Sequence, residues 1–179
     1  MNWRKSNFKP KYKIYPVNAN YMFYSCQTDL KDLRDFDIDF SRCTAFGSCF
    51  CYAWINHIGV IDTRATSGVG TLFQYHTALQ SVDKFILRND GSQKFTDTFT
   101  WTSGLTHIIF EGVIGQNGIN FQHSTKLDKE SITSIMNALS TTTSGLTVTL
   151  SQTAVNNAFT TDEWNALRAT KSNWTIALA

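Results

Sequence analysis

Phenylalanines recur at nearly constant intervals in the N-terminal part of the chain, and this periodicity limits the possible folds more than any other feature. The four anchor phenylalanines, which lie 27, 23 and 26 residues apart, are Phe23, Phe50, Phe73 and Phe99. An apolar or small residue precedes each anchor by four positions, the spacing of neighbours on one face of a short helical turn. Aliphatic residues follow each anchor at similar distances. This agreement between four segments indicates an internal repeat.

The repeat predicts how these segments assemble. A run of strand-forming residues closes most units, as in GVID at 59–62 and KFIL at 84–87. One such unit cannot bury its apolar side alone, whereas stacked units share a continuous core. We therefore expect residues 19–127 to form a short α/β solenoid of about four strand-plus-short-helix units.

The last third of the chain has a different pattern and predicts a capping unit. Asp128 can N-cap a helix in which apolar residues recur three and four positions apart. The segment LTVTL at 146–150 alternates as a strand does, and Thr160 and Glu163 have the spacing of a capping box. Because stacked repeats need a cover over the last apolar layer, we expect 128–179 to be an α/β C-terminal cap.

The repeated pattern F-x5–6-L-x2-I resembles BspA-type leucine-rich repeats, in particular a variety common in phage and prophage proteins of gut bacteria. In that variety, units like GVIDTR (59–64) are followed by a helix like ESITSIMNAL (130–139) and by a tail like that at 149–178. The resemblance covers roughly residues 19–179. It implies a leucine-rich-repeat-like solenoid in a tail, baseplate or other virion-associated protein, or in an adhesion module. Such proteins are not known as enzymes as a class.

Charge is sparse and concentrated at the N-terminus. Charged residues make up 17% of the 179 residues and the net charge is +2, which argues against a general nucleic-acid binder. Residues 1–18 form a basic arm, for which contact with phosphate or an acidic partner and a role as a solubilising extension both remain open. The cations of the basic arm are Arg4, Lys5, Lys9, Lys11 and Lys13.

No apolar run approaches the length of a membrane span, and no apolar segment of the signal-peptide kind follows the first basic residues. We expect a virion or extracellular location for a structural protein and the host cytoplasm for an effector.

The cysteines and histidines do not have the spacing of a zinc site. Cys49 and Cys51 are separated by one residue, and no second pair follows them. The repeat places Cys49 directly before an anchor phenylalanine, where it acts as a small apolar residue. A disulfide that involves Cys26, Cys43 or Cys51 remains open. We expect neither a metal nor a cofactor.

Catalytic motifs are also missing from the sequence, which has no nucleophile elbow, phosphate-binding glycine loop or H-E-x-x-H helix. Asp35, Asp37 and Asp39 alternate along an expected strand, as paired catalytic carboxylates could. Such a row is more often the solvated face of an edge strand, and we expect no enzyme and no catalytic residue.

Aromatic residues follow the anchors in register and form the candidate binding site. Large, rigid and amphipathic side chains are favoured in binding patches, although a packed row that covers the rim of the repeats is the alternative. Histidines also recur, at equivalent positions two residues after the first aliphatic residue of two units. The predicted partner-binding residues are Tyr24, Tyr52, Trp54, His57, Tyr75, His76, Trp101 and His107.

Two functions follow as expectations. The first is a non-enzymatic protein-binding or recognition module of a phage or prophage, associated with the virion or tail as a structural or host-recognition protein. Its partner is expected to be a host or virion protein or a surface glycan. The alternative is a small soluble phage-encoded effector that binds and inhibits a host defence protein such as a CRISPR component.

Overall fold

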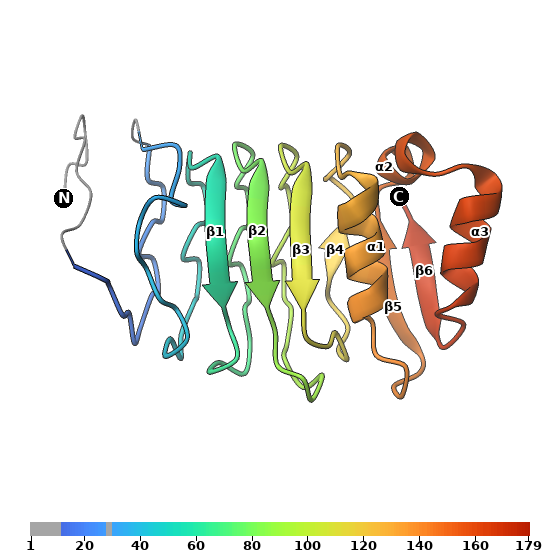
Figure 1. Cartoon of the computed structure of the whole chain (residues 1–179), viewed down its shortest axis with the longest axis horizontal. Helices are drawn as coiled ribbons and strands as arrows, with labels where there is room; N and C mark the ends of the chain where they lie inside the picture. Colours follow the sequence, from blue (N-terminus) through green and yellow to red (C-terminus); the bar gives the residue numbers. More distant parts are fainter. Residues whose placement is uncertain (1–11, 28–29) are drawn as a thin grey trace.

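The computed structural model describes residues 12–27 and 30–179. The strands of this part of the chain form two three-stranded parallel sheets, and all of its helices follow β4 (Figure 1). The first sheet contains β1 (His57–Asp62), β2 (Ser81–Ile86) and β3 (His107–Glu111) in that order. The second contains β4 (Asn120–Phe121), β5 (Leu146–Leu150) and β6 (Trp174–Leu178). The helices are α1 (Lys129–Ala138), α2 (Gln152–Ala158) and α3 (Thr161–Ala169).

The fold class predicted from the sequence, a leucine-rich-repeat-like solenoid of strand-plus-short-helix units, is wrong. The structure is a small α/β protein with two separate parallel sheets and three helices in the described residues. Before α1, the described segments between strands are turns, and none of them is a helix. An apolar pair four residues apart fits a helical turn, which is why the sequence predicted helical turns at the anchors. The same spacing also fits a non-helical turn, and the structure has non-helical turns there.

These non-helical segments share one backbone conformation, and we call residues 19–26, 46–53, 69–76 and 95–102 the aromatic turns. Each aromatic turn has a left-handed residue two positions before and two positions after its anchor, as in Thr71 and Tyr75 with φ of 55° and 57°. A non-glycine residue in this region costs about 1–2 kcal/mol. Hydrogen bonds to the next turn offset that cost: the Tyr75 N–H donates to the Thr100 carbonyl at 2.8 Å.

The anchor phenylalanines form the central column of the core. Phe50 and Phe73 stack at a centroid distance of 5.6 Å, Phe73 and Phe99 at 5.5 Å, and Phe99 and Phe121 at 4.4 Å. All four of these rings are buried. The predicted anchors Phe50, Phe73 and Phe99 are therefore interior residues, while Phe23 at the N-terminal end is partly buried and packs against the same cluster.

The first sheet ends where α1 covers the outer edge of β3. The Ile108 N–H donates to the Ser131 hydroxyl and the Phe110 N–H to the Ser134 hydroxyl, both at 2.8 Å. These bonds satisfy strand donors that a further strand would otherwise take. The helix thus ends the first sheet, whereas the second sheet combines β4, which precedes this helix in the chain, with β5 and β6, which follow it (Figure 1).

The C-terminal elements match their local sequence signals. Asp128 caps α1 by accepting from the Ser131 N–H at 2.8 Å, and Thr160 with Glu163 forms the predicted capping box of α3. The segment LTVTL is β5. Among the described residues, none of the helices combines the length and the apolar character that crossing a membrane requires.

Candidate functional site

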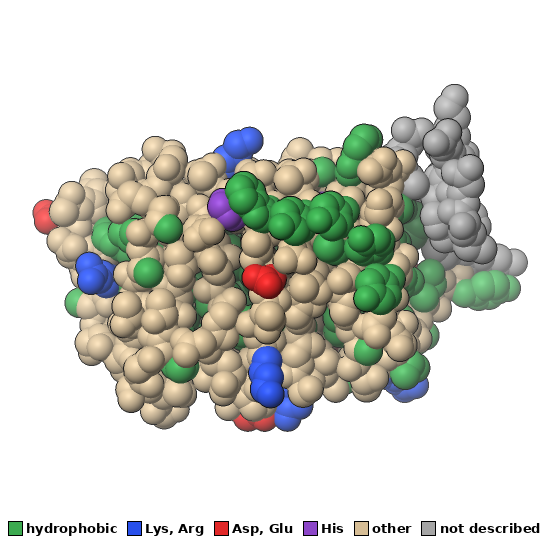
Figure 2. All heavy atoms as spheres, turned by 180° about the vertical axis from the view of Figure 1, so that it is seen from behind, with side chains coloured by type: hydrophobic (Ala, Val, Ile, Leu, Met, Phe, Trp, Pro, Cys, Tyr) green, Lys and Arg blue, Asp and Glu red, His purple; other side chains and the backbone are tan. Residues whose placement is uncertain are grey.

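A row of aromatic side chains crosses the turns on the face opposite to that seen in Figure 1. Exposed fractions of the tyrosines and the tryptophan in this row range from 38% for Tyr75 to 64% for Tyr21, so these rings are surface residues, while the histidine at its end is half-buried. Figure 2 shows an almost continuous hydrophobic band that ends at a histidine. We call this row the aromatic ladder, and its members are Tyr21, Tyr24, Tyr52, Tyr75, Trp101 and His123.

The rings of the aromatic ladder contact one another along its whole length. Tyr52 and Tyr75 are stacked at a centroid distance of 4.9 Å with 6° between their planes. Trp101 is stacked on Tyr75 at 6.5 Å and on His123 at 3.7 Å. Tyr24 meets Tyr52 edge-on at 6.0 Å. Parallel stacking covers ring faces, so the central rings present their edges and polar atoms to the solvent.

The backbone of the aromatic turns places these rings outward. Tyr52, Tyr75 and Trp101 are the left-handed residues that follow their anchors, with φ of 56°, 57° and 62°. The N–H groups of Tyr52 and Tyr75 donate to the next turn, at 3.2 Å to Gln74 and 2.8 Å to Thr100. Tyr52 and Tyr75 are therefore held at their bases by backbone hydrogen bonds and at their sides by neighbouring rings.

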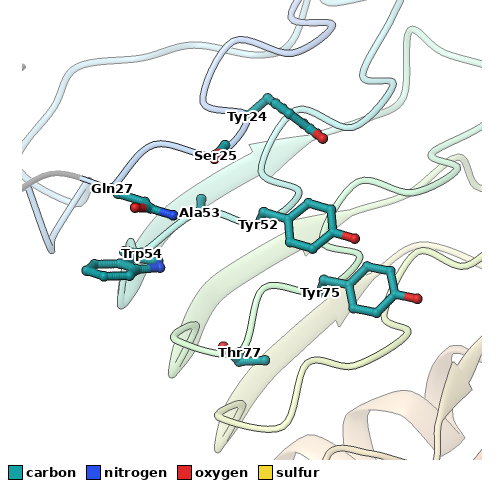
Figure 3. Close-up of a pocket in the computed structure, with 8 residues that line it drawn as sticks. All are labelled: Tyr24, Ser25, Gln27, Tyr52, Ala53, Trp54, Tyr75 and Thr77. Atoms are coloured by element: carbon teal, nitrogen blue, oxygen red, sulfur yellow. The ribbon is translucent and has the colours of Figure 1, made fainter. Parts of the chain in front are cut away.

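An open pocket of about 470 Å³ lies beside the aromatic ladder. Figure 3 shows Tyr52 and Tyr75 on one side of it, with parallel rings and hydroxyls pointing the same way, and Trp54 with Gln27 on the other. Trp54 is 48% exposed. The Lys31 ammonium lies 5.2 Å from the indole centroid and donates to the Trp54 carbonyl at 3.3 Å.

The phenol of Tyr52 stays protonated to a higher pH than an ordinary tyrosine does. Loss of hydration raises the pKa of Tyr52, and the neighbouring Tyr75, Cys51 and Tyr24 raise it further. The Tyr52 hydroxyl is thus a neutral group that can both donate and accept hydrogen bonds, and it points away from Trp54 and Gln27 (Figure 3).

Of the predicted binding residues, Tyr24, Tyr52, Tyr75 and Trp101 lie together in the aromatic ladder and Trp54 lies beside them. His76 does not belong to this surface, because its side chain is fully buried and its Nε2 lies 2.8 Å from the Ile55 carbonyl. Burial lowers the pKa of His76 to about 4, although the hydrogen bond to Ile55 opposes this shift. The imidazole is a neutral core group.

His57 and His107 are half-buried at the starts of β1 and β3, in register with Ser81 on the strand between them. The Nδ1 atom of His57 lies 2.9 Å from the Ser81 hydroxyl, and that of His107 lies 2.8 Å from an Asp128 carboxylate oxygen. The expected polar column is present, but neither histidine lines the pocket beside the ladder.

The basic arm falls mostly outside the described residues, which exclude Arg4, Lys5, Lys9 and Lys11. Lys13 is described, and its ammonium lies 3.6 Å from Asp37 and 3.4 Å from Asp39. Hydrogen bonding to Asp39 and the charge of Asp37 raise the pKa of Lys13. The Asp37–Asp39 row is thus part of an exposed ion-pair network.

The cysteines are not bonded to one another. None of Cys26, Cys43, Cys49 and Cys51 is in a disulfide, and burial raises the pKa of Cys49 and of Cys51. Within residues 12–27 and 30–179, no three His, Cys, Asp or Glu side chains are grouped in a way that could hold a metal ion.

Two members of the aromatic ladder were missed in the sequence. His123 lies two residues after Phe121, the same position that Trp101 has relative to Phe99. Phe121 continues the buried anchor column, so the segment around it repeats the aromatic turn pattern. Tyr21 lies two residues before the first anchor, at a left-handed position. Extending the anchor series by one unit would have found His123.

Neither the known family models nor the curated proteins nor the solved structures include a match to this chain.

Proposed function

We propose that this chain is a non-enzymatic recognition module of a phage or prophage, associated with the virion or tail, which binds its partner through the aromatic ladder. The observation that carries the proposal is the exposed row of mutually stacked rings. Exposed clusters of large aromatic side chains mark interaction sites more often than they mark an ordinary protein surface.

The rigidity of the aromatic ladder favours binding. Ordering a flexible side chain at an interface costs about 0.5–1.5 kcal/mol, and this cost is reduced when the side chain is already held. Tyr75 is held between Tyr52 and Trp101 in the free protein. The side chains of the ladder have therefore lost most of their conformational entropy on folding, and a partner that binds them has little further entropy cost to overcome.

The chemistry of the ladder suits a neutral or polar partner surface. Tyrosine and tryptophan combine apolar area with a hydrogen-bonding group at the outer end. Ring edges carry partial positive charge, so the edges of Tyr52 and Tyr75 favour contact with carbonyl and hydroxyl oxygens.

The phage and virion part of the proposal is supported by sequence resemblance. Segments such as GVIDTR at 59–64 and ESITSIMNAL at 130–139 resemble those of phage and prophage repeat proteins. Mass spectrometry of purified virions tests this part: the chain is expected among the virion proteins. Its absence from virions, with stoichiometric recovery of a host protein on the tagged chain, would instead identify a soluble effector.

The contact surface is tested with a photo-crosslinking amino acid in place of Tyr75. The matched control carries the same amino acid in place of Val60, which is 51% exposed on β1. We expect a crosslinked partner at position 75 and none at position 60. Excess wild-type chain should compete with this crosslink, whereas a Tyr75→Ser/Trp101→Ser chain should not. Equal crosslinking at both positions would overturn the assignment of the surface.

A further inference from the structure

The described residues that line the pocket beside the aromatic ladder have uncharged side chains. They are Tyr24, Ser25, Gln27, Tyr52, Ala53, Trp54, Tyr75 and Thr77. One described cation, that of Lys31, lies over the Trp54 indole and donates to the Trp54 carbonyl, whereas nucleic acids and phosphorylated groups need several cations to neutralise their phosphates. The described lining therefore favours a neutral ligand.

The pocket combines hydrogen-bonding groups with apolar surface. The Ser25 and Thr77 hydroxyls each donate and accept, and the Gln27 amide does both with separate atoms. The Tyr52 and Tyr75 hydroxyls point away from Trp54 and so lie at the outer side of the pocket (Figure 3). A ligand with several hydroxyl groups on one ring matches such a set, because each hydroxyl also donates and accepts. Neutral pyranose sugars have this chemistry, together with apolar C–H faces.

Trp54 supplies the apolar plane that a sugar ring needs. Trp101 gives both of its faces to other rings, since it stacks on Tyr75 and on His123. Trp54, by contrast, stacks on no other ring within the described part of the chain and remains 48% exposed, with the Lys31 ammonium 5.2 Å from its ring centroid. Its indole has surface to offer a ligand beside the ladder.

The repeat of the ladder matches a repeating ligand. Tyr52 and Tyr75 come from adjacent turns joined by parallel backbone hydrogen bonds, so their spacing follows the separation of neighbouring strands, about 4.8 Å. This separation is close to the length of one pyranose residue along an extended glycan. Successive sugar residues can therefore meet successive rings.

We infer that the pocket between Trp54 and the Tyr52–Tyr75 pair is a subsite for one neutral pyranose residue of a glycan that runs along the aromatic ladder. This inference rests on the proposed recognition function and names its ligand class. A protein partner that contacts the same rings is the competing outcome.

Titration of the full chain with neutral sugars tests the subsite. The readout is the indole N–H signals in nuclear magnetic resonance spectra. The probes are glucose, galactose, mannose and N-acetylglucosamine and short oligomers of each. We expect the Trp54 signal to move saturably with at least one sugar series, with Kd in the millimolar range for a monosaccharide, and the affinity to rise with oligomer length.

Matched variants locate the effect. Trp54→Ala should weaken monosaccharide binding at least tenfold, and Gln27→Ala provides a second exposed pocket variant. Val60→Ala, an exposed change on β1 outside the ladder and the pocket, should leave monosaccharide affinity unchanged. Trp101→Ala should reduce the gain in affinity with oligomer length. Equal loss of monosaccharide binding in Val60→Ala and Trp54→Ala would contradict the placement of the subsite.

The results separate this inference from the proposed function. If none of the sugars moves the Trp54 signal while position 75 still crosslinks to an unglycosylated protein, the glycan subsite is wrong and the recognition function stands. If sugars do not bind and position 75 gives no specific crosslink, both are wrong.

Discussion

A buried histidine determines part of the acid sensitivity of this fold. His76 is fully buried beside the Phe73 ring, and its Nδ1 atom has no hydrogen-bond partner within the described residues. Burial lowers the pKa of His76 to about 4, against about 6.5 for an exposed histidine. The unfolded chain therefore binds a proton at a higher pH than the folded chain does.

The free energy of unfolding should fall as the pH decreases from about 6.5 to about 4, with His76 accounting for about 3 kcal/mol of that loss. Above pH 6.5 both states hold a neutral imidazole, so the contribution is complete there. Urea unfolding of the wild-type chain and of His76→Thr across this range measures it. Thr is the residue at the equivalent position of the next turn, Thr102.

The free energy of unfolding of His76→Thr should depend less steeply on pH than that of the wild type, whatever the stability of the variant at neutral pH. Parallel curves for the two chains would mean that His76 does not carry this acid sensitivity.

The left-handed residues of the aromatic turns also affect the stability of the fold. Ser25 is exposed and has φ of 50°, a conformation that glycine adopts without the steric cost of a Cβ atom. Ser25→Gly should therefore raise the free energy of unfolding by up to about 1 kcal/mol, and Ser25→Val should lower it. Thermal unfolding of both variants is the measurement, and a more stable valine variant would contradict the strained geometry of the turn.

Among the elements, the junction of β3 and α1 decides where the first sheet stops. Ser131 is buried and its hydroxyl accepts the Ile108 N–H of the strand. Removal of the hydroxyl leaves a buried backbone donor unsatisfied, which costs about 1–3 kcal/mol.

Ser131→Ala should lower the free energy of unfolding by that amount, while Asn137→Ala, an exposed change on the same helix, should alter it by less than about 0.5 kcal/mol. Chemical denaturation compares the two. Equal stabilities of the two variants would show that the serine hydroxyl does not satisfy the edge of β3.

The sequence predicted some elements well and others poorly, for a physical reason. The caps at Asp128 and Thr160 and the alternation of 146–150 are local signals, and the structure confirms all three. The aromatic turns were interpreted as helical because an apolar pair four residues apart fits both conformations. Their left-handed residues are serine, threonine, tyrosine, aspartate and tryptophan, which give no glycine signal.

The candidate site was predictable to the extent that it follows the repeat. Tyr52, Tyr75 and Trp101 occupy one register position, and the sequence placed them in one column. His76 was misplaced because an outward and an inward position are consecutive in these turns, as Tyr75 and His76 are. The burial of Lys171, whose ammonium donates to the Leu139 carbonyl at 2.6 Å, depends on contacts distant in sequence and had no signal.

Across the whole molecule, the chain holds two columns of rings on one set of turns. The buried column of anchor phenylalanines supports the fold, and the exposed aromatic ladder lies two residues further along each central turn. Substitutions in the two columns should therefore have different effects. Loss of an anchor ring should unfold the chain, whereas loss of ladder rings should mainly weaken partner binding.

The affinity of the Tyr75→Ser/Trp101→Ser chain for the partner recovered by crosslinking at position 75, measured together with its thermal unfolding, tests this account most directly. Exposed stacked pairs contribute about 0.5–1.5 kcal/mol each, so the variant should remain folded with Tm lowered by a few degrees. Its affinity should fall at least tenfold. A variant that binds as tightly as the wild type, or that does not fold, would contradict the claim that the aromatic ladder is a binding surface.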